Sequence, residues 1–126
     1  MKAAKSWNIW IVLIAAACLL SGCHRSPAAR KTKFARSGSE YFQQGKYREA
    51  AIQYENAIQI DPYFADAHYQ LAQCLLKLKD WSGAYGELSR TVEIDPTNWN
   101  AQLDLGGLLV AGGRIPEARE HAETVL

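Results

Sequence analysis

Residues 65–98, ADAHYQLAQCLLKLKDWSGAYGELSRTVEIDPTN, decide the fold of this chain. The pair Asp95-Pro96 lies near the end of this stretch, and the same pair occurs 34 residues earlier as Asp61-Pro62. Small residues keep the same offset in two further series, Gly38, Ala72 and Gly106, and Ala50, Ala84 and Ala118. A fixed period of this length indicates one structural unit that is repeated along the chain, with neighbouring units stacked on each other.

Each unit is expected to contain two antiparallel helices. Between residues 47 and 58 the apolar side chains fall at positions 47, 50, 51, 54, 57 and 58, which form one face of an α-helix. Gly45-Lys46, Lys79-Asp80 and Gly112-Gly113 predict turns between paired helices. Pro62 and Pro96 end each second helix, because proline disfavours helix at the residue before it. The small residues of the two series let paired backbones approach closely.

This pattern resembles the tetratricopeptide repeat (TPR) family. Residues 65–98 follow the family consensus in Ala67-His68-Tyr69-Gln70-Leu71-Ala72, Trp81, Ala84 and Pro96, with His68 in place of the usual tryptophan. Residues 31–64 follow it less closely, with Ser37 where the family prefers leucine. The resemblance implies an all-α fold, a TPR α-solenoid of antiparallel helix hairpins over residues 34–126. It implies two and a half to three repeats, at 31–64, 65–98 and an incomplete 99–126.

Residues 1–22 are typical of an export signal. Lys2 and Lys5 precede an apolar run over residues 9–20, which is shorter than the roughly 20 residues that a membrane-spanning helix needs. Leu20-Ser21-Gly22-Cys23 then resembles the bacterial lipobox. That resemblance implies that Cys23 becomes a lipidated N-terminus. Because His24 rather than aspartate follows, it also implies the periplasmic face of an outer membrane.

Residues 23–33 are expected to form the lipidated cysteine and a flexible tether, because Ser26-Pro27 and the lack of apolar periodicity argue against a helix. A basic run without acidic residues crosses this stretch, comprising Arg25, Arg30, Lys31, Lys33 and Arg36. Two interpretations stay open. The basic side chains contact anionic lipid headgroups, or they only keep the linker soluble.

Composition argues against several functions. Lys2 and Lys5 are two of the 14 basic residues, so residues 24–126 carry 12 basic and 13 acidic side chains, too balanced for nucleic-acid binding. The three histidines are far apart, which predicts no metal site. No acid–base pair suggests an enzyme, and no cofactor or small-molecule substrate is expected. His68, Cys74, Trp81 and Trp99 are expected to lie between helices, and Glu40, Glu49, Glu55 and Glu87 in solvent.

The TPR resemblance implies that the first helices line a concave groove for a protein or peptide partner. The positions expected to face it are Phe42, Gln43, Asp66, Tyr69, Gln70, Gln73, Lys77 and Asn100, with Ala35, Ser39, Leu76, Leu103, Asp104 and Gly107 beside them. This aromatic and amide-rich set suits binding of an extended peptide or a partner helix. The alternative is that these side chains only keep the groove solvated. It does not match the lysine–asparagine clamp with which chaperone adaptors of the family bind C-terminal carboxylates.

Three functions follow as hypotheses. The first is a membrane-anchored adaptor in the bacterial cell envelope, serving assembly, secretion or polysaccharide export. The others are the docking module of a longer enzyme and a structural spacer. Because Leu126 falls inside the second helix of the third repeat, an uncovered apolar end is also expected unless a longer array or a partner covers it. Its members would be Leu103, Leu105, Leu108, Leu109 and Val125.

Overall fold

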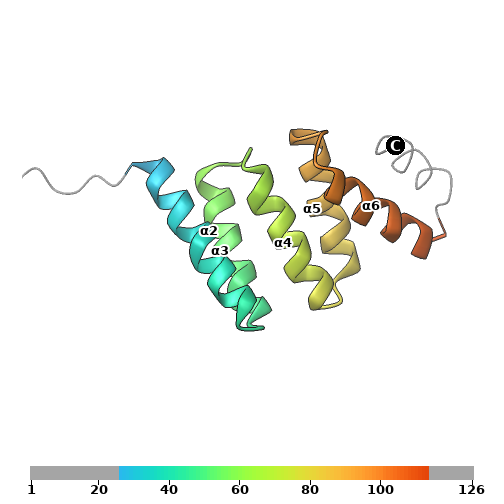
Figure 1. The fold of residues 1–126 in the computed structure, drawn as a ribbon, viewed down its shortest axis with the longest axis horizontal. Coiled ribbons are helices and arrows are strands. Elements are labelled where there is room, and N and C mark those ends of the chain that lie inside the picture. Colours follow the sequence, from blue (N-terminus) through green and yellow to red (C-terminus); the bar gives the residue numbers. More distant parts are fainter. Residues whose placement is uncertain (1–25, 114–126) are drawn as a thin grey trace, which may run out of the picture.

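The computed structural model describes residues 26–113, and this range contains five helices. They are α2 (Pro27–Gln43), α3 (Tyr47–Ile60), α4 (Ala65–Lys77), α5 (Trp81–Ile94) and α6 (Trp99–Ala111). Helices α2 and α3 form one hairpin, α4 and α5 form the next, and α6 follows them in a single row (Figure 1). The predicted all-α array of helix hairpins is confirmed.

The turns lie where the sequence predicts them. Gly45 and Gly113 adopt positive φ angles of 74° and 76°, and Lys79 occupies the equivalent place with φ of 62°. Helices α3 and α5 end one residue before Asp61 and Asp95, both of which are extended ahead of a proline. Each aspartate accepts a hydrogen bond at 3.0 Å from the backbone N–H two residues later, so the two inter-repeat turns share one local geometry.

Small residues allow the close contacts within and between hairpins. Ala50, Ala72 and Ala84 are completely buried, and Gly38 lies against the ring of Tyr54. Side chains of α3 and α4 form one apolar cluster, and α4, α5 and α6 share a second. Helix α4 therefore joins both clusters and holds the row together.

The flexible tether expected over residues 24–33 is wrong for residues 27–33, which belong to α2. Ser26 is the N-cap, and its Oγ accepts a hydrogen bond from the N–H of Ala29 at 3.2 Å. Pro27 occupies the first helical position, where the missing N–H costs nothing. A capping serine followed by proline was therefore the sequence signal for this helix start, and α2 extends the first repeat towards the N-terminus.

The apolar residues near α6 differ from expectation. Trp81 and Trp99 are not enclosed between hairpins, because they open α5 and α6 and remain 56% and 49% exposed. Leu105 and Leu109, expected to be uncovered, are buried in the second cluster, whereas Leu103 is 54% exposed as predicted. Val125, Pro116, Ala118 and the whole leader with Cys23 lie outside the described residues.

Within residues 26–113, no helix combines the length and apolar character needed to cross a lipid bilayer.

Candidate peptide-binding groove

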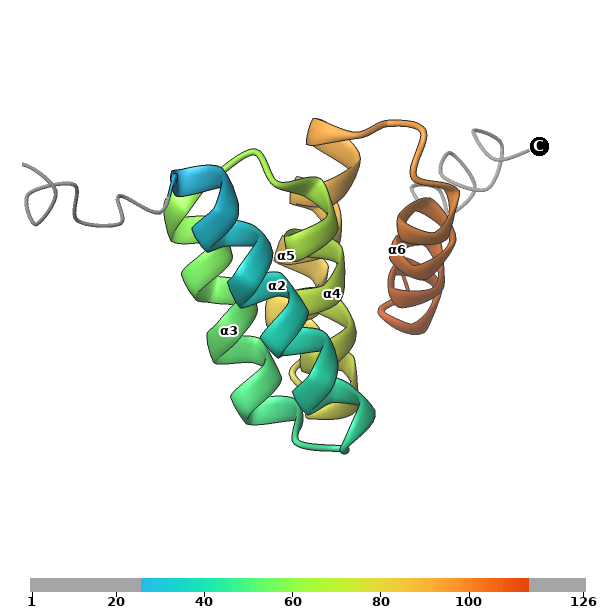
Figure 2. The ribbon, with the colours of Figure 1, turned by 60° about the vertical axis from the view of Figure 1, so that its left-hand side comes forward.

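The first helices of the hairpins, α2, α4 and α6, follow one another along one side of the row (Figure 2). Between α2 and α4 lies a hollow of about 300 Å³ that opens to solvent. Ser39 and Ala35 border it from α2, and Asp66 and Gln70 border it from α4, while the ring of Tyr54 forms part of its floor. Two of the eight predicted groove residues, Asp66 and Gln70, therefore share one hollow.

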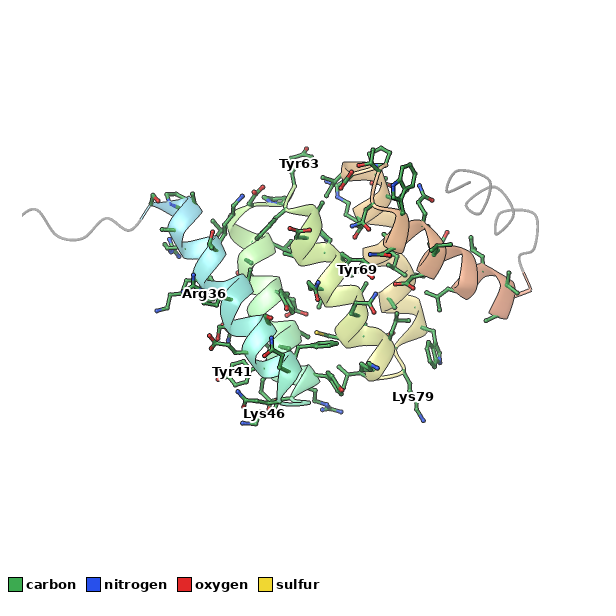
Figure 3. All side chains as sticks on the ribbon, in the orientation of Figure 1. Arg36, Tyr41, Lys46, Tyr63, Tyr69 and Lys79 are labelled. Atoms are coloured by element: carbon green, nitrogen blue, oxygen red, sulfur yellow. The ribbon has the colours of Figure 1, made fainter. Side chains whose placement is uncertain are left out.

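A hydrogen-bonded network joins α4 to α6 farther along the same side. The hydroxyl of Tyr69 donates to Asp104 Oδ2 at 3.2 Å, and the amide of Gln73 donates to the same oxygen at 2.7 Å. Tyr69 lies on the face of the array that is turned to the viewer in Figure 3. Burial and the neighbouring Asp104 carboxylate raise the pKa of Tyr69 to about 12, so its hydroxyl keeps its proton and remains a donor.

The other predicted groove residues lie apart from these two groups. Phe42 stacks edge-on against Tyr47, with ring centroids 5.1 Å apart, and therefore helps to close the first hairpin. Gln43 is exposed and donates to Ser39 Oγ at 3.4 Å. Lys77 and Asn100 are exposed in the last turn of α4 and the first turn of α6, respectively.

The charge of this side is slightly acidic. Asp66 and Asp104 contribute carboxylates from α4 and α6, and Lys77 contributes one ammonium group at the end of α4. Asp104 is half-buried and already accepts two hydrogen bonds, whereas Asp66 is exposed. Residues 26–113 contain no group of three histidine, cysteine or acidic side chains that could hold a metal ion.

His68 joins the two helices of the second hairpin to each other and to the turn that precedes α4. Its Nδ1–H donates to Glu87 Oε2 on α5 at 2.6 Å, and its Nε2–H donates to the carbonyl of Pro62 at 3.1 Å. A carboxylate and a carbonyl oxygen can only accept, so each ring nitrogen needs a proton of its own to make both hydrogen bonds. The hydrogen bond to Glu87 favours this charged ring and raises the pKa of His68. The expectation that Glu87 faces solvent is therefore wrong, because this carboxylate is half-buried and paired. His68 is buried, as predicted.

Cys74 is fully buried in the first apolar cluster, and burial raises its pKa to about 11. A thiol in this state is protonated and out of reach of reagents in solution. The prediction that Cys74 acts as a small apolar core residue is confirmed.

Comparison with known proteins agrees with this geometry. A family profile described as TPR repeat matches residues 38–79. The first TPR of Spaghetti (RPAP3), solved with the HSP90 peptide SRMEEVD, superposes with a TM-score of 0.73 at 27% identity and covers 83% of this chain and 82% of that one. The described residues form a TPR repeat domain. The Arabidopsis OM64 TPR domain shares the fold, with a TM-score of 0.74 at 20% identity over 80% of this chain and 84% of that one.

The segment that matches curated relatives is a small part of much longer chains. Sperm-associated antigen 1 from Homo sapiens is 30% identical over 95 residues, which span 75% of this chain and 10% of that protein. Peptidyl-prolyl cis-trans isomerase FKBP4 from Bos taurus is 28% identical over 104 residues, which span 71% of this chain and 23% of that protein. The chain thus spans less than a quarter of the length of either relative.

Proposed function

We propose that this chain is a membrane-anchored adaptor of the bacterial cell envelope, which binds a protein partner through the groove side of its TPR domain. A lipid on Cys23 would hold it at the periplasmic face of the outer membrane. The lipobox-like residues Leu20-Ser21-Gly22-Cys23 support the anchor. The partner would belong to an assembly, secretion or polysaccharide-export complex.

The groove side supports binding because its polar groups are already held in place. The Tyr69–Asp104–Gln73 network fixes the spacing between α4 and α6, so these side chains lose little freedom when a partner arrives. The hollow beside Ser39 and Gln70 offers amide and hydroxyl groups next to apolar floor atoms. An extended peptide or a helix with alternating apolar and polar side chains fits that mixture.

The negative charge of the groove side argues against binding of peptides with acidic C-terminal ends. The peptide SRMEEVD, bound by the solved Spaghetti domain, carries four acidic groups near its end, namely two glutamates, the terminal aspartate side chain and the terminal carboxylate. Here Asp66 and Asp104 would repel such an end, and Lys77 is the one basic side chain among the predicted groove positions. We expect SRMEEVD to bind this chain at least tenfold more weakly than it binds a carboxylate-clamp domain.

Photocrosslinking in living cells tests the adaptor role. A crosslinking amino acid at Asp66, which is exposed at the hollow, should give one dominant protein adduct. The matched control is Ser82, which is exposed on the second helix α5 and should give none. The same adducts from both positions, or no adduct from residue 66, would reject the proposal and favour a structural spacer.

The anchor has a separate test. Cys23→Ser removes the sulfur that would carry the lipid. We expect loss of labelled-palmitate incorporation and release of the protein from the membrane fraction, while Cys74→Ser, the matched control at a buried thiol, keeps both. Unchanged labelling and partitioning in the Cys23 variant would contradict the anchor.

A second candidate is the docking module of a longer envelope enzyme. One observation favours it, since the matching segment occupies only 23% of a relative that is named as a peptidyl-prolyl isomerase. A catalytic domain encoded in frame after Leu126 would support this function.

A further inference from the structure

The outer face of α2 is strongly basic. Of the four basic residues in α2, Lys31 turns inward, where it pairs with Asp61 and lies 4.7 Å from the ring centroid of Phe64. The other three, Arg30, Lys33 and Arg36, are all exposed, and Arg36 projects away from the row in Figure 3. We call Arg30, Lys33 and Arg36 the basic face.

Helix geometry places these three side chains together. They are three residues apart, so each lies about one turn from the next, and the whole set spans roughly 9 Å along the axis. The residues beside them on this surface, Ala29 and Thr32, are small and exposed. No side chain of the basic face forms an ion pair within residues 26–113, and the first acidic residue of α2 is Glu40, one turn beyond Arg36.

We propose that the basic face of α2 docks onto anionic lipid headgroups and orients the TPR domain on the membrane. Each arginine or lysine held at an anionic bilayer surface contributes to binding, and the positive end of the α2 dipole lies beside Arg30. The rest of the domain does not share this charge, since residues 24–126 as a whole carry one more acidic than basic side chain.

The position of α2 in the fold makes this docking compatible with partner binding. Helix α2 is the first helix of the row and contacts mainly α3, so its outer face is not used in the described array. The row extends from α2 towards α6, which places the network of Tyr69 and Asp104 away from the basic face. A domain seated on α2 would stand on the membrane with its groove accessible.

The inference rests on the proposed lipid anchor. Cys23 precedes Pro27 by four residues, so a lipid on its sulfur would hold the start of α2 within roughly 14 Å of the bilayer. The tether thus lets the basic face come within the Debye length of about 8 Å over which surface attraction acts at physiological salt. Tethering also raises the local concentration of headgroups that the basic face meets.

The experiment uses the lipidated protein, produced from the full gene and reconstituted in vesicles. Ala29→Cys, beside the basic side chains, carries an environment-sensitive fluorophore, and Ser82→Cys on α5 carries the same label as a control. The native Cys74 is buried and does not compete for label. Quenching by acrylamide, a neutral solute, is compared between phosphatidylcholine vesicles and vesicles that are one-third phosphatidylglycerol.

We expect the label at residue 29 to be protected only on phosphatidylglycerol vesicles, and high salt to remove the protection. The triple variant Arg30→Gln/Lys33→Gln/Arg36→Gln should lower the ratio of docked to undocked protein by about a hundredfold, which corresponds to roughly fivefold per charge. The matched variant Lys46→Gln/Arg48→Gln/Lys79→Gln loses the same charge at exposed sites outside the groove and should keep full protection. Circular dichroism checks that both variants remain helical.

Two failures can be told apart. If the protein does not float with neutral vesicles, the lipid anchor is rejected. If it floats with both kinds of vesicle but the label at residue 29 is quenched equally in both, docking by the basic face is overturned. Protection in cells without protection on phosphatidylglycerol vesicles would also overturn it, because a protein rather than lipid would then cover the face.

Discussion

Gly38 and Tyr54 meet so closely that a Cβ atom on residue 38 would lie 2.8 Å from Cζ of the tyrosine ring. Gly38 is buried on α2, and Tyr54 is buried on α3 at the point where the two helices cross. Burial raises the pKa of Tyr54 to about 12, against the smaller opposite effect of a hydrogen bond with Ser39. The close packing of α2 against α3 therefore requires a residue without a side chain at position 38.

Gly38→Ala should destabilise the domain by about 1–3 kcal/mol, because the added methyl group meets ring atoms rather than a flexible chain end. The free energy of unfolding in urea measures this. Gly86→Ala is the matched control, since a Cβ at that exposed helical glycine meets nothing within 4 Å. This control substitution should raise the free energy of unfolding by about 0.5–1 kcal/mol, because alanine has the higher helix propensity. Equal effects at the two glycines would refute the close contact.

The His68–Glu87 pair predicts a stability that falls with rising pH. The folded state raises the pKa of His68 above its unfolded value near 6.5, so folded protein holds this proton more tightly. The contribution of this proton to the free energy of unfolding is complete below about pH 6.5, as long as Glu87 is ionised. It is lost as the pH rises through the raised pKa of folded His68. Wild type should lose about 1.5 kcal/mol relative to Glu87→Gln between pH 6 and pH 9.

Unfolding free energies across that pH range measure the difference between the two proteins. Glu49→Gln removes an exposed carboxylate on α3 and should follow the wild-type slope. The prediction fails if the Glu87→Gln protein shows the wild-type pH dependence.

Local signals explain why so much of the fold was predictable. Gly45 and Pro62 act on their own backbone and on immediate neighbours, so their spacing fixes the turns and helix ends. The burial of Ala50 and Ala84 followed from the repeat period. Helix α2 starts earlier than predicted, because the prediction relied on the lack of apolar periodicity in residues 24–33, whereas Ser26 before Pro27 caps a helix there.

The interactions that sequence reasoning did not predict join residues far apart in the chain. Glu87 reaches His68 across 19 positions, and Asp104 reaches Gln73 across 31. Nothing in the local pattern distinguishes Glu87 from Glu49, because both occupy polar positions on second helices. Asp104 was expected to face the groove, but its role as the shared acceptor of Tyr69 and Gln73 depends on the angle between α4 and α6.

Cys74 should be unreactive in the folded protein. Its thiol is fully buried and its pKa is raised to about 11, so thiolate is scarce at pH 8. Modification by a disulfide reagent, in a Cys18→Ser/Cys23→Ser background, should be at least about a hundredfold slower than in denaturant. An introduced cysteine at the exposed position Ser82 should react at the same rate in both conditions. Rapid modification of native Cys74 would contradict its placement in the core.

The contact between Gln73 and Asp104 should couple α4 to α6 energetically. Asp104→Ala leaves the donors of Tyr69 and Gln73 without their shared acceptor and should cost about 1–3 kcal/mol. A double-mutant cycle of Gln73→Ala with Asp104→Ala should give an interaction free energy of about 1 kcal/mol, measured by urea unfolding.

The control for this cycle pairs Gln73→Ala with Asp66→Ala, two turns away on the same helix, where no hydrogen bond joins the side chains. Its interaction free energy should be within about 0.3 kcal/mol of zero. If both cycles give the same value, Asp104 does not link the two helices. In that case the spacing of the groove would depend only on the apolar contacts of Leu105 and Leu109 behind it.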